Sequence, residues 1–456
     1  MANLIKIKRG LNIPVNGKPI EMIGTSVLPK EFALIPEYYH GVTPKLLVKE
    51  GDDVKAGTPV FYEKQFPGMN FVSPVSGRIK AVNRGERRKI ISIIIQSDDK
   101  MTYESFDKSD LSTMTAEEVI AKLQQAGLWS YIKQRPYDVI ANPLKTPKAI
   151  FISTFDSAPL APNNDYVLSS QMTDFQTGID ALSKIAKIHL GIKAGKKSPF
   201  QQVKNVEQTA YEGPHPAGNV GVQINHVDPV NKGEVVWTVN PQDVLFIGRF
   251  FNKNVVDLSR TIALTGPCVK SPQYYQTVVG ANIESMVQGK INNCSHRFIS
   301  GNVLTGIKVA GNGFMDPYAT QITVIEEGNN IHELLGWGMP RFRKFSVSRT
   351  YFTAILESKL LRNLFGNIKY KWDARLMGGK RAIIMSGEYD KVLPMDIYPE
   401  FLFKAMIAGN IDKMEALGAY EIAPEDVALC EFVCTSKLPL QQIVRNSLDI
   451  MKKELE

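Results

Sequence analysis

The spacing of hydrophobic positions changes along this chain and divides it into segments. In residues 1–100 the apolar positions fall in short β-branched runs such as Ile90–Ile95, separated by glycine and proline, a pattern that predicts strands and turns. From Thr115 to Glu118 the chain carries the residues of a capping box, followed by apolar positions at helical spacing. We therefore expect an all-β domain over 1–100 and helices after it.

The next segment alternates between the two kinds of pattern. Ala149–Ser153 reads as a short buried strand, residues 179–185 carry the apolar face of a helix, and Glu234–Val239 and Val244–Phe250 read as further strands. Alternating strands and helices favour a partly parallel sheet covered by helices. We expect a Rossmann-like α/β domain over 101–256.

Strands return in the third segment, and helices dominate the last. One helix-like stretch, Asn282–Gln288, lies among strand patterns at Thr261–Leu264, Ile299–Thr305 and Gln321–Glu326. This mixture predicts a β-grasp domain over 257–339. Residues 340–456 predict a helical domain, with helices expected at Tyr351–Phe365, Glu400–Ala408, Ile411–Leu417 and Pro424–Glu454. The fold class is thus α+β with several domains.

The stretch Leu46–Lys80 resembles the half-barrel of biotinyl and lipoyl carrier domains, with two matching Gly-containing turns on either side of a hairpin. A carrier needs a lysine at the hairpin tip, because the cofactor is attached there as an amide. We expect the tip at Phe66-Pro67-Gly68, with Lys64 short of it on the strand. The half-barrel is therefore expected without the carrier lysine.

Composition narrows the class of protein. A hydrophobic content of 44% and a charged content of 22% are those of a globular chain. No apolar run approaches the roughly 20 residues of a membrane span, and the basic start MANLIKIKRG has no apolar stretch of a secretory signal after it. Four cysteines fit a reducing compartment better than a disulfide framework.

The formal net charge of +8 is concentrated near the N-terminus, most densely at Arg84, Arg87, Arg88 and Lys89. An anionic membrane surface, an acidic partner subunit or nucleic acid would suit such a cluster. A solvated hairpin turn without a specific partner is the favoured explanation of the basic cluster. No nucleic-acid-binding motif accompanies the cluster, so we expect no nucleic-acid partner.

The segment Tyr211–Val230 is the first candidate site, with His215, Asn219 and His226 among prolines and glycines. Loops of this composition often bind ligands or partners, and a rigid loop with structural histidines is the equally weighted alternative. The ten-residue spacing of the histidines is poor for a metal site.

Cys430 and Cys434 form the second candidate, because a spacing of four places both thiols on one helix face. Two ligands do not complete a zinc or iron–sulfur site. Buried structural thiols are the favoured interpretation, and a metal site is expected only if a partner chain completes it.

Two aromatic-rich segments form the third candidate. Aromatic side chains with polar tips suit a flat, partly polar ligand such as a quinone, or a contact near a membrane. Packing between domains is the favoured alternative. The residues concerned are Phe32, Tyr38, Tyr39, Trp129, Tyr131 and Tyr137.

Five segments together resemble one family. They are RPYDVIANP (135–143), PKAIFIS (147–153), DSAPLAP (156–162), GPHPAGNVG (213–221) and LCEFVCTSK (429–437), and they are similar to the A subunits of the Na+-translocating NADH:quinone oxidoreductase. That family is related to the flavin-carrying subunit of complex I and to the C subunit of the Rnf complex. The relationship implies the domain order given above, with a soluble-ligand-binding β-grasp as the third domain.

Two departures from those relatives concern cofactors. The flavin-carrying subunit of complex I has a glycine-rich loop for the phosphates of FMN and NADH, whereas residues 127–136 here are bulky. The relatives also carry a Cys-x2-Cys-x2-Cys motif, where only Cys430 and Cys434 stand in this chain. The resemblance therefore implies a chain that binds no redox cofactor, in a complex that uses NADH, flavins, iron–sulfur clusters and ubiquinone.

The resemblance implies a peripheral subunit on the cytoplasmic face of the inner membrane. The complex would couple NADH oxidation and ubiquinone reduction to sodium export, as a translocase. This chain would dock on other subunits, mainly a membrane-embedded one, and quinone is a possible ligand. Two alternatives stay open, namely a flavin-binding subunit that itself oxidises NADH and a pure assembly scaffold.

Overall fold

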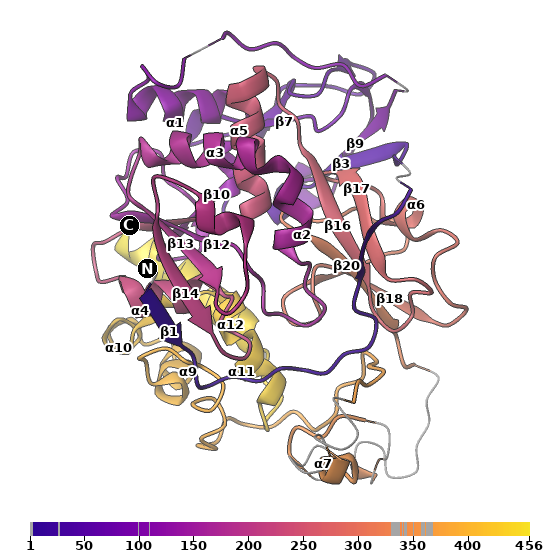
Figure 1. The fold of residues 1–456 in the computed structure, drawn as a ribbon, viewed down its shortest axis with the longest axis vertical. Coiled ribbons are helices and arrows are strands. Elements are labelled where there is room, and N and C mark those ends of the chain that lie inside the picture. The colour runs from indigo at the N-terminus through magenta and orange to yellow at the C-terminus, as the bar shows by residue number, and fades with distance from the viewer. Residues whose placement is uncertain are drawn as a thin grey trace.

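The computed structural model describes residues 3–25, 28–98, 100–108, 110–329, 338–339, 341, 344–349, 351–356, 361 and 368–456. Four β-sheets of seven, six, four and three strands organise these residues. Figure 1 shows the largest sheet, with helices on both of its faces, beside the six-stranded sheet, and the C-terminal helices below and behind them. The structure is therefore mixed α/β, as expected.

The two smallest sheets form a half-barrel at the top of Figure 1. The four-stranded sheet has the order β3 (Glu31–Leu34), β9 (Ile90–Ser97), β8 (Gly77–Arg84) and β5 (Asp53–Val54). The three-stranded sheet has the order β4 (Pro44–Leu46), β6 (Pro59–Glu63) and β7 (Phe66–Val72). Their apolar faces share a core in which the rings of Phe61 and Phe71 stack 4.5 Å apart.

The position expected for the hairpin tip is wrong. Phe66, Pro67 and Gly68 belong to strand β7, and Glu63 pairs with Phe66 across a turn made by Lys64 and Gln65. Two-residue turns are the commonest hairpin connection, and the Pro-Gly pair misled the prediction. A lysine therefore does lie at the tip, and the tip residue does not distinguish this half-barrel from a carrier domain.

The seven-stranded sheet is the α/β domain. Its order is β1 (Asn3–Lys6), β14 (Glu207–Glu212), β13 (Ile188–Lys193), β12 (Ala149–Ser153), β15 (Val236–Val239), β10 (Ile132–Arg135) and β11 (Val139–Ile140). The first five strands are parallel and the last two antiparallel. After β12 the chain adds β13 and β14 on one side, and then crosses to add β15 on the other.

Helices α1 (Ala116–Gln125), α2 (Asn164–Leu168), α3 (Met172–Ser183), α4 (Val220–Val227) and α5 (Pro241–Lys253) belong to this domain. The capping box that Thr115 and Glu118 predict is present at the start of α1. The strand expected at Val244–Phe250 is wrong, because these residues lie in α5. Asn240 accepts a hydrogen bond from the Gln242 N–H and Pro241 begins the helix, which are the start signals that a nearly continuous apolar run concealed.

The six-stranded sheet has the order β19 (Ile307–Val309), β18 (His296–Ser300), β20 (Gln321–Glu326), β16 (Ser259–Thr265), β17 (Gln273–Val278) and β2 (Ile20–Ile23), with the short helix α6 (Ile283–Val287). The strand expected at Ile299–Thr305 ends at Ser300, and a loop follows it.

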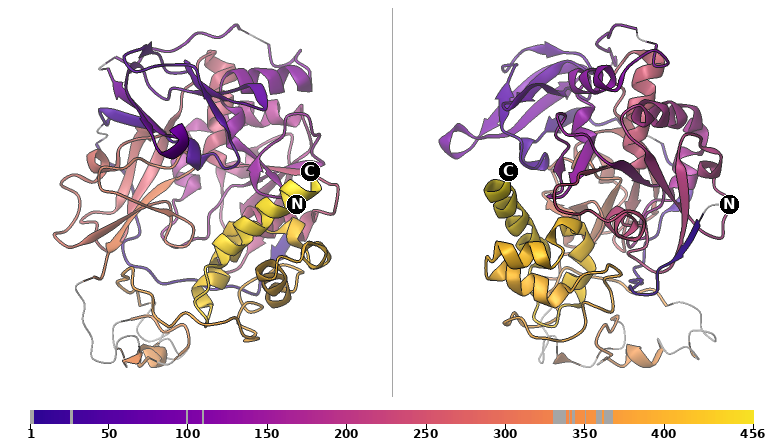
Figure 2. Two further views of the ribbon diagram at one scale, coloured as in Figure 1. Left: turned by 180° about the vertical axis from the view of Figure 1, so that it is seen from behind. Right: turned by 90° about the vertical axis from the view of Figure 1, so that its left-hand side faces the viewer.

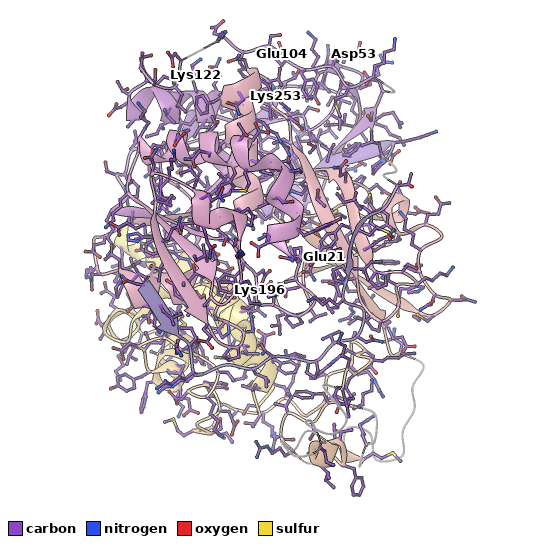
Figure 3. The ribbon with its side chains drawn as sticks, in the orientation of Figure 1. Glu21, Asp53, Glu104, Lys122, Lys196 and Lys253 are labelled. Carbon is purple, nitrogen blue, oxygen red and sulfur yellow. The ribbon has the colours of Figure 1, made fainter. Side chains whose placement is uncertain are left out.

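The N-terminal segment connects the two large sheets. β1 pairs with β14 and β2 pairs with β17, so the indigo chain in Figure 1 runs across the molecule from one sheet to the other. The Asn163 amide donates to the Glu21 carboxylate at 2.8 Å, and Glu21 is labelled beside α2 in Figure 3. The range 1–100 expected for the half-barrel therefore contains two strands that pair in other sheets.

The C-terminal helices are α7 (Thr353–Leu356), α9 (Pro399–Ile407), α10 (Ile411–Ala416), α11 (Ala428–Val433) and α12 (Leu440–Leu455). The single helix expected over Pro424–Glu454 is wrong, since 434–439 separate α11 from α12. Most of the helix expected over Tyr351–Phe365 lies outside the described residues. The helices pack against the α/β domain through one apolar cluster that includes Ile7, Val222 and Leu448, and Figure 2 shows α12 along that face.

None of the described helices combines the length and the apolar character needed to cross a membrane.

Candidate functional site: a cavity between the domains

A cavity of about 430 Å³ lies where the domains meet. Its wall includes Tyr38 from the half-barrel, Ser153 and Asn240 from the α/β domain, Ser300 from the six-stranded sheet, and Gln441 from α12. The volume is within the usual range for small-molecule sites, which often lie between domains.

The topology of the seven-stranded sheet explains the position of the cavity. Ser153 is the last residue of β12, Val239 is the last residue of β15, and both line the cavity. The chain continues from β12 through α2 and α3 to β13 on one side of β12, whereas β15 lies on its other side, so the strand order reverses between β12 and β15. Open α/β sheets bind ligands at the carboxyl ends of strands at such a switch point.

Tyr38, Tyr131, His215 and Asn219 line this cavity, although they come from segments far apart in the sequence. Tyr38 ends the 3-10 helix η1 (Pro36–Tyr38), and Tyr131 ends η3 (Trp129–Tyr131). The structure therefore brings together one residue from each aromatic segment and two from the Gly/Pro-rich loop.

Both loop residues are held in place by contacts to other segments. His215 Nδ1 lies 3.0 Å from Ser157 Oγ, and the His215 N–H donates to Asn12. Asn219 precedes α4, and its side chain donates to the Glu425 carbonyl at 3.3 Å. Burial lowers the pKa of His215 to about 4, so the imidazole is neutral near pH 7.

Three of the aromatic candidates lie in packed cores and not on the cavity wall. Phe32 is 1% exposed within β3. Tyr39 packs edge-on against Phe71 at 4.7 Å. Trp129 is fully buried, donates from Nε1 to the Ala141 carbonyl at 2.7 Å, and packs against Trp237. These contacts are the ones expected if the aromatic side chains serve packing and not ligand binding.

Tyr137 and His226 also lie away from the cavity wall. Tyr137 has a φ of 77°, and its carbonyl accepts a hydrogen bond from Arg445 at 2.6 Å. His226 lies on α4 with Nδ1 2.8 Å from the Val222 carbonyl. In each case the polar groups are used to hold local structure.

The cavity wall is acidic. Five carboxyl side chains and one lysine, Lys133, line it, and the acids are Asp138, Asp156, Asp243, Asp316 and Glu425. A wall rich in carboxyl groups suits ligands that donate or accept hydrogen bonds better than it suits phosphate groups.

Burial raises the pKa values of four of these acids, which are Asp156, Asp243, Asp316 and Glu425. Burial raises the pKa of Asp243 to about 7, against the opposing effect of its ion pair with Arg260. Burial also raises the pKa of Asp316, which accepts a hydrogen bond from the Tyr318 N–H at 2.7 Å. Carboxyl groups with raised pKa values can donate protons near neutral pH.

Tyr318 and Lys133 are cavity residues that sequence reasoning missed. The Tyr318 ring lies 6.0 Å from the rings of both Tyr39 and Tyr131 and donates from its hydroxyl to the Ser130 carbonyl. The Lys133 ammonium lies 4.1 Å from the Tyr318 ring centroid. Tyr318 follows a loop with no motif, so only the assembled fold reveals it.

Cys430 and Cys434 are both fully buried. Cys430 lies in α11, and Cys434 follows the last residue of that helix with its sulfur 3.0 Å from the Tyr389 hydroxyl. Burial raises the pKa of Cys430 well above its usual range. These contacts are those expected of structural thiols, and neither sulfur is exposed to a partner chain.

Comparison with known proteins places the chain in a family. Models described as the NqrA N-terminal barrel-sandwich hybrid domain, the NqrA second alpha/beta domain and the NQRA C-terminal domain match residues 5–98, 114–256 and 261–311. The air-oxidized NAD+-reducing [NiFe]-hydrogenase aligns over 77% of this chain and 72% of that chain, with a TM-score of 0.34 at 11% identity.

Curated relatives match from end to end. The A subunit of the Na(+)-translocating NADH-quinone reductase from Neisseria meningitidis serogroup A is 38% identical, over 99% of this chain and 100% of the relative. The corresponding protein of Pasteurella multocida is 36% identical over the same shares. The chain therefore belongs to the family of A subunits of the Na(+)-translocating NADH-quinone reductase.

Proposed function

We propose that this chain is a peripheral subunit, on the cytoplasmic face of the membrane, of a complex that oxidises NADH, reduces a quinone and exports sodium. Its relatives carry the name of that complex. The chain would dock on a membrane-embedded subunit, and the flavins and iron–sulfur clusters of the complex would lie on other chains.

The observation that carries a role in quinone binding is the inter-domain cavity. Tyr38 and Tyr131 line it, with Asn219 and Lys133 on the same wall. Ring faces can pack on a planar quinone, and amide, hydroxyl and ammonium groups can donate hydrogen bonds to its carbonyl oxygens. The raised pKa values of Asp243 and Asp316 favour their protonated forms, which can donate the protons that quinone reduction consumes.

The same cavity argues against flavin or NADH on this chain. Both cofactors carry phosphate groups, which bind best at glycine-rich loops and helix N-termini. The first residues of α4 and α5 do line the cavity, but five carboxyl groups lie on the same wall. An absorbance spectrum of the purified chain with stoichiometric flavin would contradict the proposal. An intact mass above that of the sequence would show a covalently attached group, and peptide mapping would then test whether it lies on Lys64.

The direct test is a titration of the purified chain with a water-soluble quinone analogue, followed by ligand-observed NMR. We expect Tyr131→Phe and Tyr38→Phe to weaken binding by about one hydrogen bond, or roughly 0.5–1.5 kcal/mol. The matched control is Tyr398→Phe, because Tyr398 is 69% exposed and is not part of the cavity wall. Trp129→Ala is unsuitable, since it would open a hole in the core.

Equal binding of the quinone analogue by the wild type and both tyrosine variants would show that quinone does not bind in this cavity. No binding by the folded chain, either alone or in the assembled complex, would favour a pure scaffold.

A further inference from the structure

Three side chains with metal-binding atoms meet at one end of the central strands of the six-stranded sheet. Cys268, Cys294 and His296 each present a ligand atom within 4.8 Å of the other two. The sulfurs of Cys268 and Cys294 lie 3.2 Å apart. The two cysteines belong to loops that are separated in sequence. No short sequence motif therefore predicts the pair.

The backbone holds these loops against the same strand. The Cys268 N–H donates to the Val324 carbonyl of β20, and its own carbonyl accepts from the Asn292 N–H at 2.8 Å. His296 begins β18 and pairs with Glu326 of β20. His296 is therefore positioned by a strand and Cys268 by backbone hydrogen bonds of its loop, which helps to pre-organise a site.

His296 supplies a second, independent observation. Its Nε2 is buried and finds no hydrogen-bond partner among the described residues. Buried polar atoms are nearly always paired, and an exception calls for an explanation such as an ion. An ion bound at Nε2 would satisfy it.

We propose that Cys268, Cys294 and His296 bind a zinc ion. Two thiolates and a neutral imidazole balance the charge of Zn2+, which a partly buried site requires. Binding forms two Zn–S bonds and one Zn–N bond and releases the two thiol protons to solvent. Water takes the fourth tetrahedral position, because Cys294 and His296 are only half-buried.

The sulfur spacing suits this ion better than it suits a disulfide. Two sulfurs bound to one tetrahedral zinc stand roughly 3.8 Å apart, so the pair needs to open by about half an ångström. A disulfide bond of about 2 Å would require about twice that movement in the other direction.

The ion would link the loop after β16 to the loop before β18. β18 runs from His296 at this site to Ser300 on the cavity wall. The zinc would thus fix the far end of a strand that helps to form the cavity, a structural role at a distance from the ligand.

The test measures metal on the full-length chain. Reduced, chelator-treated protein is reconstituted with Zn2+, dialysed, and assayed by elemental mass spectrometry and thermal unfolding. Reconstitution with Co2+ adds a thiolate-to-cobalt charge-transfer band as a report on cysteine ligation. The variants are Cys294→Ser and His296→Gln. The matched controls are Cys430→Ala and His226→Gln, whose side chains lie in other parts of the structure.

We expect one zinc per wild-type chain and per control chain, with a raised melting temperature. The two variants should lose at least about tenfold in affinity, and the melting temperature of His296→Gln should no longer respond to zinc. Absence of retained zinc in the reduced wild type would overturn the proposal. So would zinc retained equally by both variants, or conversion of Cys268 and Cys294 to a disulfide that excludes metal.

Discussion

Two carboxylates beside the seven-stranded sheet, one at the junction with the C-terminal helices and one in the cavity, have opposite surroundings. At the junction with the C-terminal helices, Asp426 is fully buried and lies 2.6 Å from the Arg135 guanidinium, which is 1% exposed. Asp426 also accepts a hydrogen bond from the Ala423 N–H. In the cavity, Asp316 accepts from the Tyr318 N–H, and within the described part of the chain no ion pair joins it to a lysine or arginine.

The difference separates a structural role from a binding role. A carboxylate that is paired with a buried guanidinium, as Asp426 is with Arg135, holds two segments together. A carboxylate without a cation, such as Asp316, holds its proton more tightly and leaves hydrogen-bonding capacity for a ligand. The junction should therefore govern stability, and the cavity should govern binding.

The largest effect is expected from Asp426→Ala. The substitution leaves the Arg135 guanidinium buried with only Glu425, which lies 2.8 Å away and is 42% exposed. Removing one member of a buried pair costs about 3–5 kcal/mol in unfolding free energy. Urea unfolding followed by circular dichroism measures the loss.

The control for that prediction is the double variant Arg135→Met, Asp426→Leu. Replacing both members of a buried pair with apolar residues is often close to neutral, so it should recover most of the stability. A loss below about 1 kcal/mol in Asp426→Ala would show that the junction is not organised by this pair.

Neither region could be foreseen from the sequence alone. Arg135 and Asp426 are 291 positions apart, and no local pattern couples them. The cavity draws its wall from every domain, and sequence reasoning found Tyr38, Tyr131 and His215 only because aromatic and Gly/Pro-rich segments often carry function. Tyr39, from the same aromatic segment as Tyr38, packs into the core, since composition does not tell which side chain faces a cavity.

The elements with strong local signals were predicted, and those with competing signals were not. The capping box at Thr115 and the apolar strand Ala149–Ser153 are present as expected. The strand predicted at Val244–Phe250 is wrong because its apolar residues follow one another with little interruption, and such a short run does not distinguish a buried strand from a buried helix. The last expected helix is interrupted at residues 434–439. Apolar periodicity alone did not reveal this short interruption before Pro439.

A smaller effect is expected from His215→Gln, and it depends on pH. Since the folded pKa of His215 lies near 4, below its ordinary value of 6.5, wild-type stability falls as the pH drops through that window. The variant lacks this loss. Its stability relative to wild type should rise by about 2–3 kcal/mol between about pH 7 and about pH 4.5. Denaturant unfolding at both pH values measures it, and His226→Gln is the control.

A flat difference between the two pH values would mean that His215 is solvated in the folded chain. The carboxyl groups of the cavity titrate in both proteins, so their contributions cancel in the comparison.

Gly221→Ala tests the packing of the junction. An added Cβ would lie 2.4 Å from both carboxylate oxygens of Asp426, and overpacking of this kind costs roughly 1–3 kcal/mol. Gly379→Ala is the matched control, because its added Cβ would meet nothing within 4 Å. Thermal unfolding of the two variants should differ, and equal melting temperatures would show that Asp426 can move without loss.

Asp316→Asn gives the smallest expected effect and the sharpest contrast with Asp426. The raised pKa of Asp316 means that its ionised form is disfavoured in the folded chain, so above that pKa the charge reduces stability. Asparagine keeps an oxygen for the Tyr318 N–H and removes the charge. We expect stability at about pH 8 to be unchanged or higher by up to about 1 kcal/mol, while quinone-analogue affinity changes. A loss comparable to that of Asp426→Ala would place Asp316 in the structural class, and the distinction between the two regions would fail.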